Sequence, residues 1–238
     1  MDSNYSGGVS AIILAGGSGT RAANHNSSTT PKQYLEIGGK PVLSYSVEVF
    51  LRLSFVDEII IVAASEWLDY CKKHVVKPNN KIKFAEGGKT RQESSLNGVK
   101  AANSPYVMIH DGARPFVMPD DIERLYSSVI SNNAAILAIP VTDTVKEVEK
   151  VDGAFQVTRT ICRNSLMAAV TPQAFKRDLL LKAHEKALYS GFSCTDDSSL
   201  LEYMGESVTI VMGSSENIKI TTREDLIYAD YIVGRDKA

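Results

Sequence analysis

The most informative stretch of the sequence is Val9-Ser10-Ala11-Ile12-Ile13-Leu14-Ala15-Gly16-Gly17-Ser18-Gly19-Thr20-Arg21. Ten residues later comes a second segment, Pro31-Lys32-Gln33-Tyr34. The apolar half predicts a buried strand, and the glycine-rich half predicts a loop that binds phosphate. Because glycine has no Cβ, consecutive backbone N–H groups of this loop can turn inward and form a nest for an anion. Arg21 and Lys32 supply the fixed positive charge that a triphosphate requires.

Two commoner glycine-rich loops compete with this interpretation. A Walker A loop needs Gly-Lys followed by Ser or Thr at the head of a helix, and Thr20-Arg21 follows Gly19 instead, so that loop is excluded. The spacing Gly17-x-Gly19-x-x-Ala22 fits a dinucleotide fingerprint, but it runs into a polar stretch, 24–31, rather than into a helix. A dehydrogenase loop and a plain connecting turn stay as alternatives, and the turn leaves both cations unexplained.

Length and composition predict one domain over residues 1–238. A chain of 238 residues, 44% of them hydrophobic, can bury a sizeable core. The formal net charge of −2 argues against a nucleic-acid partner, which usually requires a basic face. No apolar run reaches membrane-spanning length, so we expect no membrane partner.

The cysteines bear on the compartment. Cys71, Cys162 and Cys194 are odd in number and widely spaced, which is typical of reduced thiols in a cytoplasmic protein. The polar start of the chain does not resemble a secretory signal. A plastid-type compartment is the alternative if a transit peptide is removed from a longer precursor.

Apolar runs alternate with amphipathic stretches along the chain. The apolar runs predict strands over 58–64, 81–84, 106–110, 135–139 and 208–211. Helical periodicity covers 43–51, 67–74, 94–102, 119–131, 176–189 and 195–204. This alternation predicts a doubly wound, mostly parallel α/β sheet, in which ligands bind beyond the carboxyl ends of the strands.

One segment, 141–163, breaks the alternation. Charged and β-branched residues alternate on both sides of Asp152-Gly153, which predicts a hairpin of two half-exposed strands. An isolated two-stranded hairpin is marginally stable in water. We therefore expect this projecting β-arm to pack against a second subunit of a homodimer. The alternative is an arm that folds back on its own domain.

Polar clusters follow several of the predicted strands. Gly87-Gly88-Lys89-Thr90-Arg91-Gln92-Glu93-Ser94 opens a helix and offers amides, a guanidinium and a hydroxyl to a phosphate or a base edge. Asp111 and Arg114 follow the next strand and form either a ligand site or a structural ion pair. Asp111 is the candidate ligand for Mg²⁺ or another divalent cation, because Mg²⁺ usually takes one or two carboxylates plus phosphate oxygens.

Two further segments are ambiguous from the residues alone. Lys219 follows the last predicted strand and is either a solvated lysine or a functional cation. Thr195-Asp196-Asp197 is most simply a helix N-cap, with acidic groups at the positive end of the helix. Neither segment alone assigns a function.

Taken together and in this order, the motifs resemble the 2-C-methyl-D-erythritol 4-phosphate cytidylyltransferase family. The resemblance extends over residues 11–229 and rests on segments 14–21, 31–34, 87–94, 110–115, 143–146, 171–173, 195–197 and 217–221. It implies a Rossmann-like nucleotidyltransferase that uses CTP to activate methylerythritol phosphate for isoprenoid biosynthesis. Relatives that activate ribitol 5-phosphate share several motifs, so a polyol phosphate is the alternative acceptor. A non-catalytic nucleotide-binding regulator is a third interpretation.

The resemblance also implies a role for each matched residue. The catalytic cations would be Arg21, Lys32 and Lys219. The substrate-binding residues would be Ala15, Gly16, Gly17, Gly19, Gly88, Ser94, Asp111, Arg114, Thr144, Arg163 and Thr171. Within this set, Ala15, Gly88 and Ser94 would contact cytosine, whereas Thr144 and Arg163 would reach the acceptor site of the other subunit. No general base is expected, because a phosphate monoester is largely dianionic at neutral pH.

Overall fold

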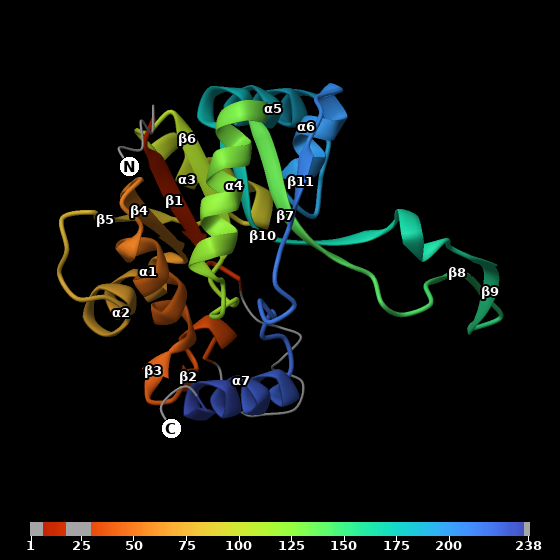
Figure 1. Cartoon of the computed structure of the whole chain (residues 1–238), viewed down its shortest axis with the longest axis horizontal. Helices are drawn as coiled ribbons and strands as arrows, with labels where there is room; N and C mark the ends of the chain where they lie inside the picture. Colours follow the sequence, from red (N-terminus) through yellow and green to blue (C-terminus); the bar gives the residue numbers. More distant parts are fainter. Residues whose placement is uncertain (1–6, 18–29, 236–238) are drawn as a thin grey trace.

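The computed structural model describes residues 7–17 and 30–235 and is built around a seven-stranded sheet (Figure 1). In spatial order its strands are β11 (Thr209–Met212), β7 (Ala134–Pro140), β10 (Met167–Lys176), β6 (Tyr106–Asp111), β1 (Val9–Leu14), β4 (Val56–Ala63) and β5 (Ile82–Glu86). β10 runs antiparallel to β6 and β7, and every other neighbouring pair is parallel. The predicted mostly parallel sheet is confirmed.

Helices cover both faces of this sheet. One face carries α1 (Val42–Arg52) and α4 (Pro119–Asn132), and the other carries α3 (Arg91–Ala101), α5 (Arg177–Ser190) and α6 (Ser198–Met204). A short α2 (Leu68–Tyr70) continues into a π-helical turn, Cys71–Val75. The small hairpin of β2 (Glu36–Ile37) and β3 (Lys40–Pro41) packs against α7 (Arg223–Arg235). Among the helices described, none is long and apolar enough to cross a membrane.

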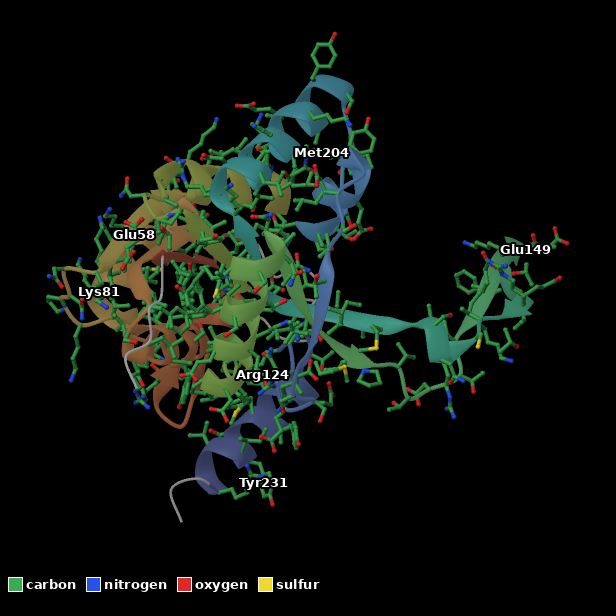
Figure 2. The ribbon with its side chains drawn as sticks, turned by 45° about the horizontal axis from the view of Figure 1, so that its top comes forward. Glu58, Lys81, Arg124, Glu149, Met204 and Tyr231 are labelled. Atoms are coloured by element: carbon green, nitrogen blue, oxygen red, sulfur yellow. The ribbon has the colours of Figure 1, made fainter. Side chains whose placement is uncertain are left out.

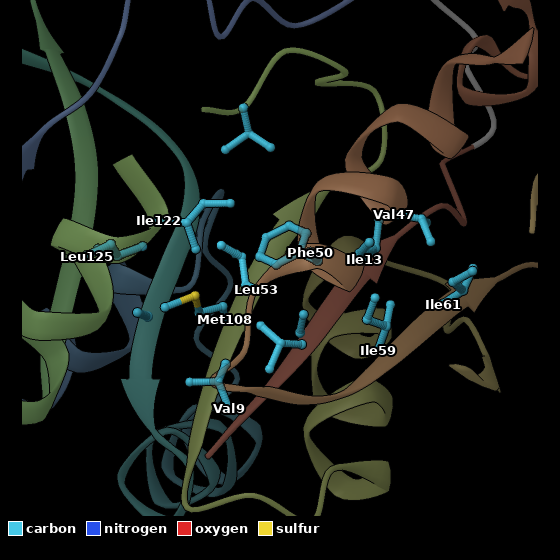
Figure 3. Close-up of a cluster of buried hydrophobic side chains, with 14 of the residues drawn as sticks. Val9, Ile13, Val47, Phe50, Leu53, Ile59, Ile61, Met108, Ile122 and Leu125 are labelled. Atoms are coloured by element: carbon cyan, nitrogen blue, oxygen red, sulfur yellow. The ribbon is translucent and has the colours of Figure 1, made fainter. Parts of the chain in front are cut away.

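The core explains why the strands read as continuous apolar runs. Successive residues of a strand point to opposite faces, so Ile13 of β1 joins the α1 side while Ile12 joins the α3 side. Figure 3 shows the first cluster, in which Phe50 of α1 and Ile122 of α4 lie over the strands. Both faces of the strands are thus covered by helices, as a parallel sheet requires.

The sequence analysis did not predict β10 and α7, and it did not predict the short strands β2 and β3. β10 contains Pro172, and proline argues against a strand because it cannot donate to the ladder. In the structure Pro172 lies where the register against β7 shifts, between Ala169 and Gln173. α7 buries only Ala229, Ile232 and Val233, so its helical periodicity is weak.

The arm forms the predicted hairpin. β8 (Lys146–Val151) pairs antiparallel with β9 (Ala154–Thr160) as a separate two-stranded sheet. Asp152 and Gly153 both adopt positive φ, +49° and +85°, which is the turn geometry that Asp-Gly favours. Figures 1 and 2 show the arm projecting from the body, with Glu149 at its far end. The arm therefore does not fold back on its own chain, and that alternative is wrong.

Candidate active site

The predicted loops meet at one edge of the sheet. β1 and β6 pair in parallel with Leu14 opposite Asp111, and the N–H of Gly112 donates to the Leu14 carbonyl at 2.9 Å. Next along the edge, the N–H of Gly87 donates to the carbonyl of Ala63 at 2.8 Å. The loops that follow β1, β5 and β6 are thereby fixed side by side, at the carboxyl ends where α/β sheets bind ligands.

The start of the glycine-rich loop is held by the segment that carries Lys32. Gln33 Nε2 donates to the carbonyls of Ala15 and Gly17 at 2.6 and 3.1 Å, and the Tyr34 hydroxyl donates to Ala15 at 3.0 Å. In a trans peptide the N–H points opposite to the preceding carbonyl, so the N–H of Gly16 faces away from Gln33. Gly19 and Arg21 lie outside the described residues, and their roles stay predictions.

The second loop packs directly against the first. Ser94 Oγ accepts from the N–H of Gly88 at 3.0 Å and donates to the carbonyl of Thr90 at 2.9 Å. Thr90 also caps α3 by accepting from the N–H of Glu93 at 3.1 Å. A Cβ placed on Gly16 would lie 3.6 Å from Ser94 Oγ. The structure thus brings Gly16 next to Ser94 and Gly88, which lie more than 70 residues later in the chain.

Beside these loops lies a cavity of about 300 Å³. Arg91 and Asp196 line it. So do four residues that the sequence analysis assigned to the site, namely Asp111, Arg114, Thr171 and Lys219. They come from β6 and the loop after it, from β10 and from the segment after β11, which converge because β10 inserts between β6 and β7. Asp111 of the cavity is the register partner of Leu14, after which the glycine-rich loop begins, so the cavity lies beside the start of that loop.

Three cations surround the Asp111 carboxylate. Lys219 Nζ lies 2.7 Å from Oδ2, Arg91 Nε lies 3.5 Å from Oδ1, and Arg114 Nε lies 3.9 Å from Oδ2. Burial alone would raise the pKa of Asp111, but the charges of Arg91 and Lys219 outweigh it and hold that pKa well below its usual range. Asp111 is therefore ionised at neutral pH. The cavity lining also contains Asp196, and Arg91 pairs with Asp197 behind it, so Lys219 and Arg114 are the cations of this part of the cavity that can face an anionic ligand.

The sequence analysis offered the Arg91 guanidinium to a phosphate or a base edge but did not place it beside Asp111, and it assigned no role to Gln173. Arg91 Nη1 donates to the buried Asp197 at 2.8 Å, so the guanidinium bridges Asp197 and Asp111. Gln173 Oε1 accepts from the N–H groups of Asp197 and Ser198 at 3.0 and 3.2 Å, which caps the start of α6. The Thr-Pro-Gln motif was the available signal, but only the placement of β10 against α6 shows what its glutamine does.

The N-cap interpretation of residues 195–197 is confirmed for one of the two acids. Asp196 accepts from the N–H of Ser199 at 3.3 Å and from the Gln173 amide at 2.8 Å. Asp197 instead points into the interior, where it binds Arg91. The pair therefore both caps α6 and fixes a cation of the cavity.

The sequence model of the 2-C-methyl-D-erythritol 4-phosphate cytidylyltransferase family matches residues 9–235. This chain belongs to that family. A protein of that name from Clostridium botulinum (strain Eklund 17B / Type B) is 41% identical over 230 residues, which cover 95% of this chain and 100% of the relative. A protein of the same name from Clostridioides difficile (strain 630) is 40% identical over 232 residues, 96% of this chain and 94% of the relative.

Solved structures of the cytidylyltransferase family share the fold. The 4-diphosphocytidyl-2C-methyl-D-erythritol synthase of Anaerococcus prevotii superposes with a TM-score of 0.83 at 35% identity, covering 96% of each chain. The Francisella tularensis cytidylyltransferase gives a TM-score of 0.79 at 30% identity, covering 94% of this chain and 99% of that one. The Rossmann-like nucleotidyltransferase architecture is thus confirmed.

The two residues that the family resemblance assigns to the arm lie apart from the cavity of their own chain. Thr144 and Arg163 are exposed at the base of the arm, and Arg163 Nη1 donates to the carbonyl of Thr142 at 2.7 Å. Neither residue lines the cavity beside Asp111. Their part in a shared site stays a prediction.

A buried histidine supports three of the cavity residues from behind. His110 Nε2 lies 3.0 Å from the Arg114 carbonyl, and Nδ1 lies 3.2 Å from Thr171 Oγ1. Thr171 Oγ1 in turn accepts from the N–H of Asp111 at 3.0 Å. Burial lowers the pKa of His110 to about 4, so the ring is neutral at pH 7.

This histidine should make stability depend on pH. The unfolded chain binds a proton at His110 near pH 6.5 and the folded chain near pH 4, so the contribution is complete above pH 6.5 and is lost as the pH falls toward 4. Between pH 7 and 5, protonation of His110 should lower the unfolding free energy of the wild type by roughly 2 kcal/mol. We expect His110→Gln to lack this part of the pH dependence. Urea unfolding at both pH values measures it, with His74→Gln, at an exposed histidine, as control. Equal pH dependence of wild type and His110→Gln would contradict the prediction.

Proposed function

We propose that this chain transfers the cytidylyl group of CTP to 2-C-methyl-D-erythritol 4-phosphate and releases pyrophosphate, a step of isoprenoid precursor biosynthesis. The observation that carries the proposal is the cavity around Asp111, which Lys219 and Arg114 line and which lies beside the end of β1, where the glycine-rich loop begins. One loop would bind a nucleotide, and the cavity would bind an anionic acceptor. Membership of the cytidylyltransferase family supports this pairing of substrates.

The reaction would be an in-line displacement at phosphorus. A phosphate oxygen of the acceptor forms a bond to the α-phosphorus of CTP, and the bond from that phosphorus to the pyrophosphate oxygen breaks. The acceptor phosphate is already largely deprotonated at neutral pH, so no side chain has to remove a proton. The main obstacle is repulsion between two polyanions, which Lys219 and Arg114 on one side and Lys32 and Arg21 on the other would offset.

A divalent cation such as Mg²⁺ would lower the remaining charge of the triphosphate. Within residues 7–17 and 30–235 no three histidine, cysteine or acidic side chains are arranged to hold a metal. Asp111 supplies a single carboxylate, which Lys219 already contacts at 2.7 Å. These residues do not fit a resident metal site, so we propose that the cation arrives bound to CTP, and that Asp111 contributes at most one ligand.

The metal role of Asp111 can be tested by Asp111→Asn. If Asp111 lends a ligand, the variant should still bind CTP but should need a higher Mg²⁺ concentration for half-maximal activity, because one charged ligand is lost. The measurement is a Mg²⁺ titration of pyrophosphate release at saturating substrates. An unchanged titration midpoint would mean that Asp111 forms ion pairs but does not bind the metal.

The arm would join two chains into a homodimer. Its apolar side chains Val148, Phe155 and Val157 are 46%, 74% and 60% exposed in the single chain. Burying them against a second subunit would supply the hydrophobic contact that an isolated hairpin lacks. In such a dimer, Thr144 and Arg163 of each arm would complete the acceptor site of the partner.

One experiment tests the proposed activity against its alternatives. The protein is incubated with CTP, Mg²⁺ and either methylerythritol phosphate or ribitol phosphate, and pyrophosphate release is followed. We expect turnover with methylerythritol phosphate, and with CTP in preference to UTP or ATP. The relatives described above are named for the methylerythritol substrate, so ribitol phosphate is not favoured. Faster turnover of ribitol phosphate would overturn the acceptor assignment, and no turnover of either would favour a regulator.

A further inference from the structure

We propose that His110 orients the Thr171 hydroxyl so that this residue can only accept a hydrogen bond in the acceptor cavity, and that the site thereby selects a substrate hydroxyl at this position. The inference rests on the proposed cytidylyl transfer. It gives a specificity role to a histidine that does not itself touch the substrate. His110 acts through Thr171 and is a positioning residue.

The first step concerns the ring of His110. Its Nε2 lies 3.0 Å from the carbonyl oxygen of Arg114. A carbonyl oxygen can only accept, so Nε2 carries the proton. The ring is fully buried, and its Nδ1 faces the hydroxyl of Thr171 rather than a carboxylate. A buried ring without an acidic partner is neutral, so Nδ1 carries a lone pair.

The second step concerns the Thr171 hydroxyl. Its oxygen lies 3.2 Å from Nδ1 of His110 and 3.0 Å from the backbone nitrogen of Asp111. Because the lone pair of Nδ1 can only accept, the hydroxyl proton of Thr171 points at His110. The N–H of Asp111 donates to one lone pair of the same oxygen. A hydroxyl oxygen has two lone pairs, so one is left.

The third step concerns the cavity. Thr171 lines it together with Lys219 and Arg114, whose charged groups are donors. The Thr171 carbonyl is already used, because Asn217 Nδ2 donates to it at 2.8 Å. The remaining lone pair of the hydroxyl would repel a phosphate oxygen and attract a hydroxyl proton. The phosphate of the acceptor would thus lie toward the cations, and a hydroxyl of its polyol chain toward Thr171.

The tautomer can be measured without substrate. Nitrogen NMR of the full-length protein at pH 7 separates protonated from unprotonated ring nitrogens, and the signals lost in His110→Gln assign this residue. We expect the neutral ring with its proton on Nε2. A proton on Nδ1, or on both nitrogens, would overturn the proposal, because Thr171 could then donate into the cavity.

The selectivity can be measured with analogues of methylerythritol phosphate in which fluorine replaces each hydroxyl in turn. Fluorine cannot donate a hydrogen bond, so one analogue should lose about tenfold or more in kcat/KM with the wild type. Thr171→Val should abolish the discrimination at that position, whereas Thr171→Ser should retain it. Thr195→Val, at another threonine of the cavity, should also retain it.

The ratio between hydroxyl and fluorine substrates separates this inference from a general loss of activity. Equal discrimination in wild type and Thr171→Val at every position would overturn it. If the wild type fails to turn over unmodified methylerythritol phosphate, the proposed function fails instead. If Thr171→Val does not fold, the NMR measurement on the wild type still decides the orientation.

Discussion

Replacing Lys219 by methionine is expected to lower kcat/KM for cytidylyl transfer about 100- to 1,000-fold while the protein stays folded. The Lys219 ammonium lies 2.7 Å from Asp111 and lines the cavity proposed for the acceptor. Removing it deletes a charge where two anions must approach, in a site partly shielded from water. Its side chain is 38% exposed, so little packing is lost. Steady-state kinetics and a thermal melt of the same sample measure the two effects.

A matched control is available at the small hairpin. Lys40 forms an ion pair of similar length, 2.8 Å, with Glu48, and both side chains are more than 40% exposed. Lys40→Met removes the same charge from a lysine that does not line the cavity, so its activity should stay within about twofold of wild type. Comparable losses in both variants would mean that Lys219 acts through overall charge or folding rather than at the site.

A mixed dimer of two inactive variants is expected to recover one active site of the two. Arg163→Ala removes the arm contact but leaves Lys32 in place, whereas Lys32→Ala removes the proposed triphosphate cation but leaves the arm intact. If each arm completes the partner's site, one site of the heterodimer combines a wild-type arm with a wild-type Lys32. Mixing the variants under conditions that exchange subunits and following pyrophosphate release measures the recovery.

The control for this experiment is each variant exchanged with itself, which should stay inactive. Mixtures of Lys32→Ala and Lys219→Met offer a second control, because both changes lie outside the arm. If Lys32 and Lys219 act in the same body, as proposed, each site of this mixture keeps one of the two defects. No activity should then be recovered. No recovery in the Arg163 mixture, together with a monomer in sedimentation, would contradict the shared site.

The sequence predicted those parts of the site that depend on short local patterns. The glycine-rich loop and residues 87–94 each follow a strand, and parallel strands end at one edge, so their meeting there could be inferred. The hairpin turn at Asp152-Gly153 was likewise a local signal. In each case the signal lies in residue types that are close together in the sequence.

The network behind the cavity could not be predicted in the same way. β10 is antiparallel in a sheet whose other pairs are parallel, and it contains a proline that argues against a strand. Its position brings Thr171 to His110 and Gln173 to α6, contacts that span 61 and 24 residues. Such pairings depend on the assembled sheet, and no periodicity of the chain encodes them.

The antiparallel course of β10 also changes what the arm is. β7 and β10 are antiparallel neighbours in the sheet, so residues 141–166, which contain the arm, are, topologically, the loop of one very long hairpin. The length of a hairpin loop can change while its two strands stay paired, since each doubling of a flexible loop costs only about 0.6 kcal/mol. The surface that we propose joins subunits can therefore be lengthened, trimmed or exchanged over evolutionary time or by engineering, while the catalytic body keeps its register.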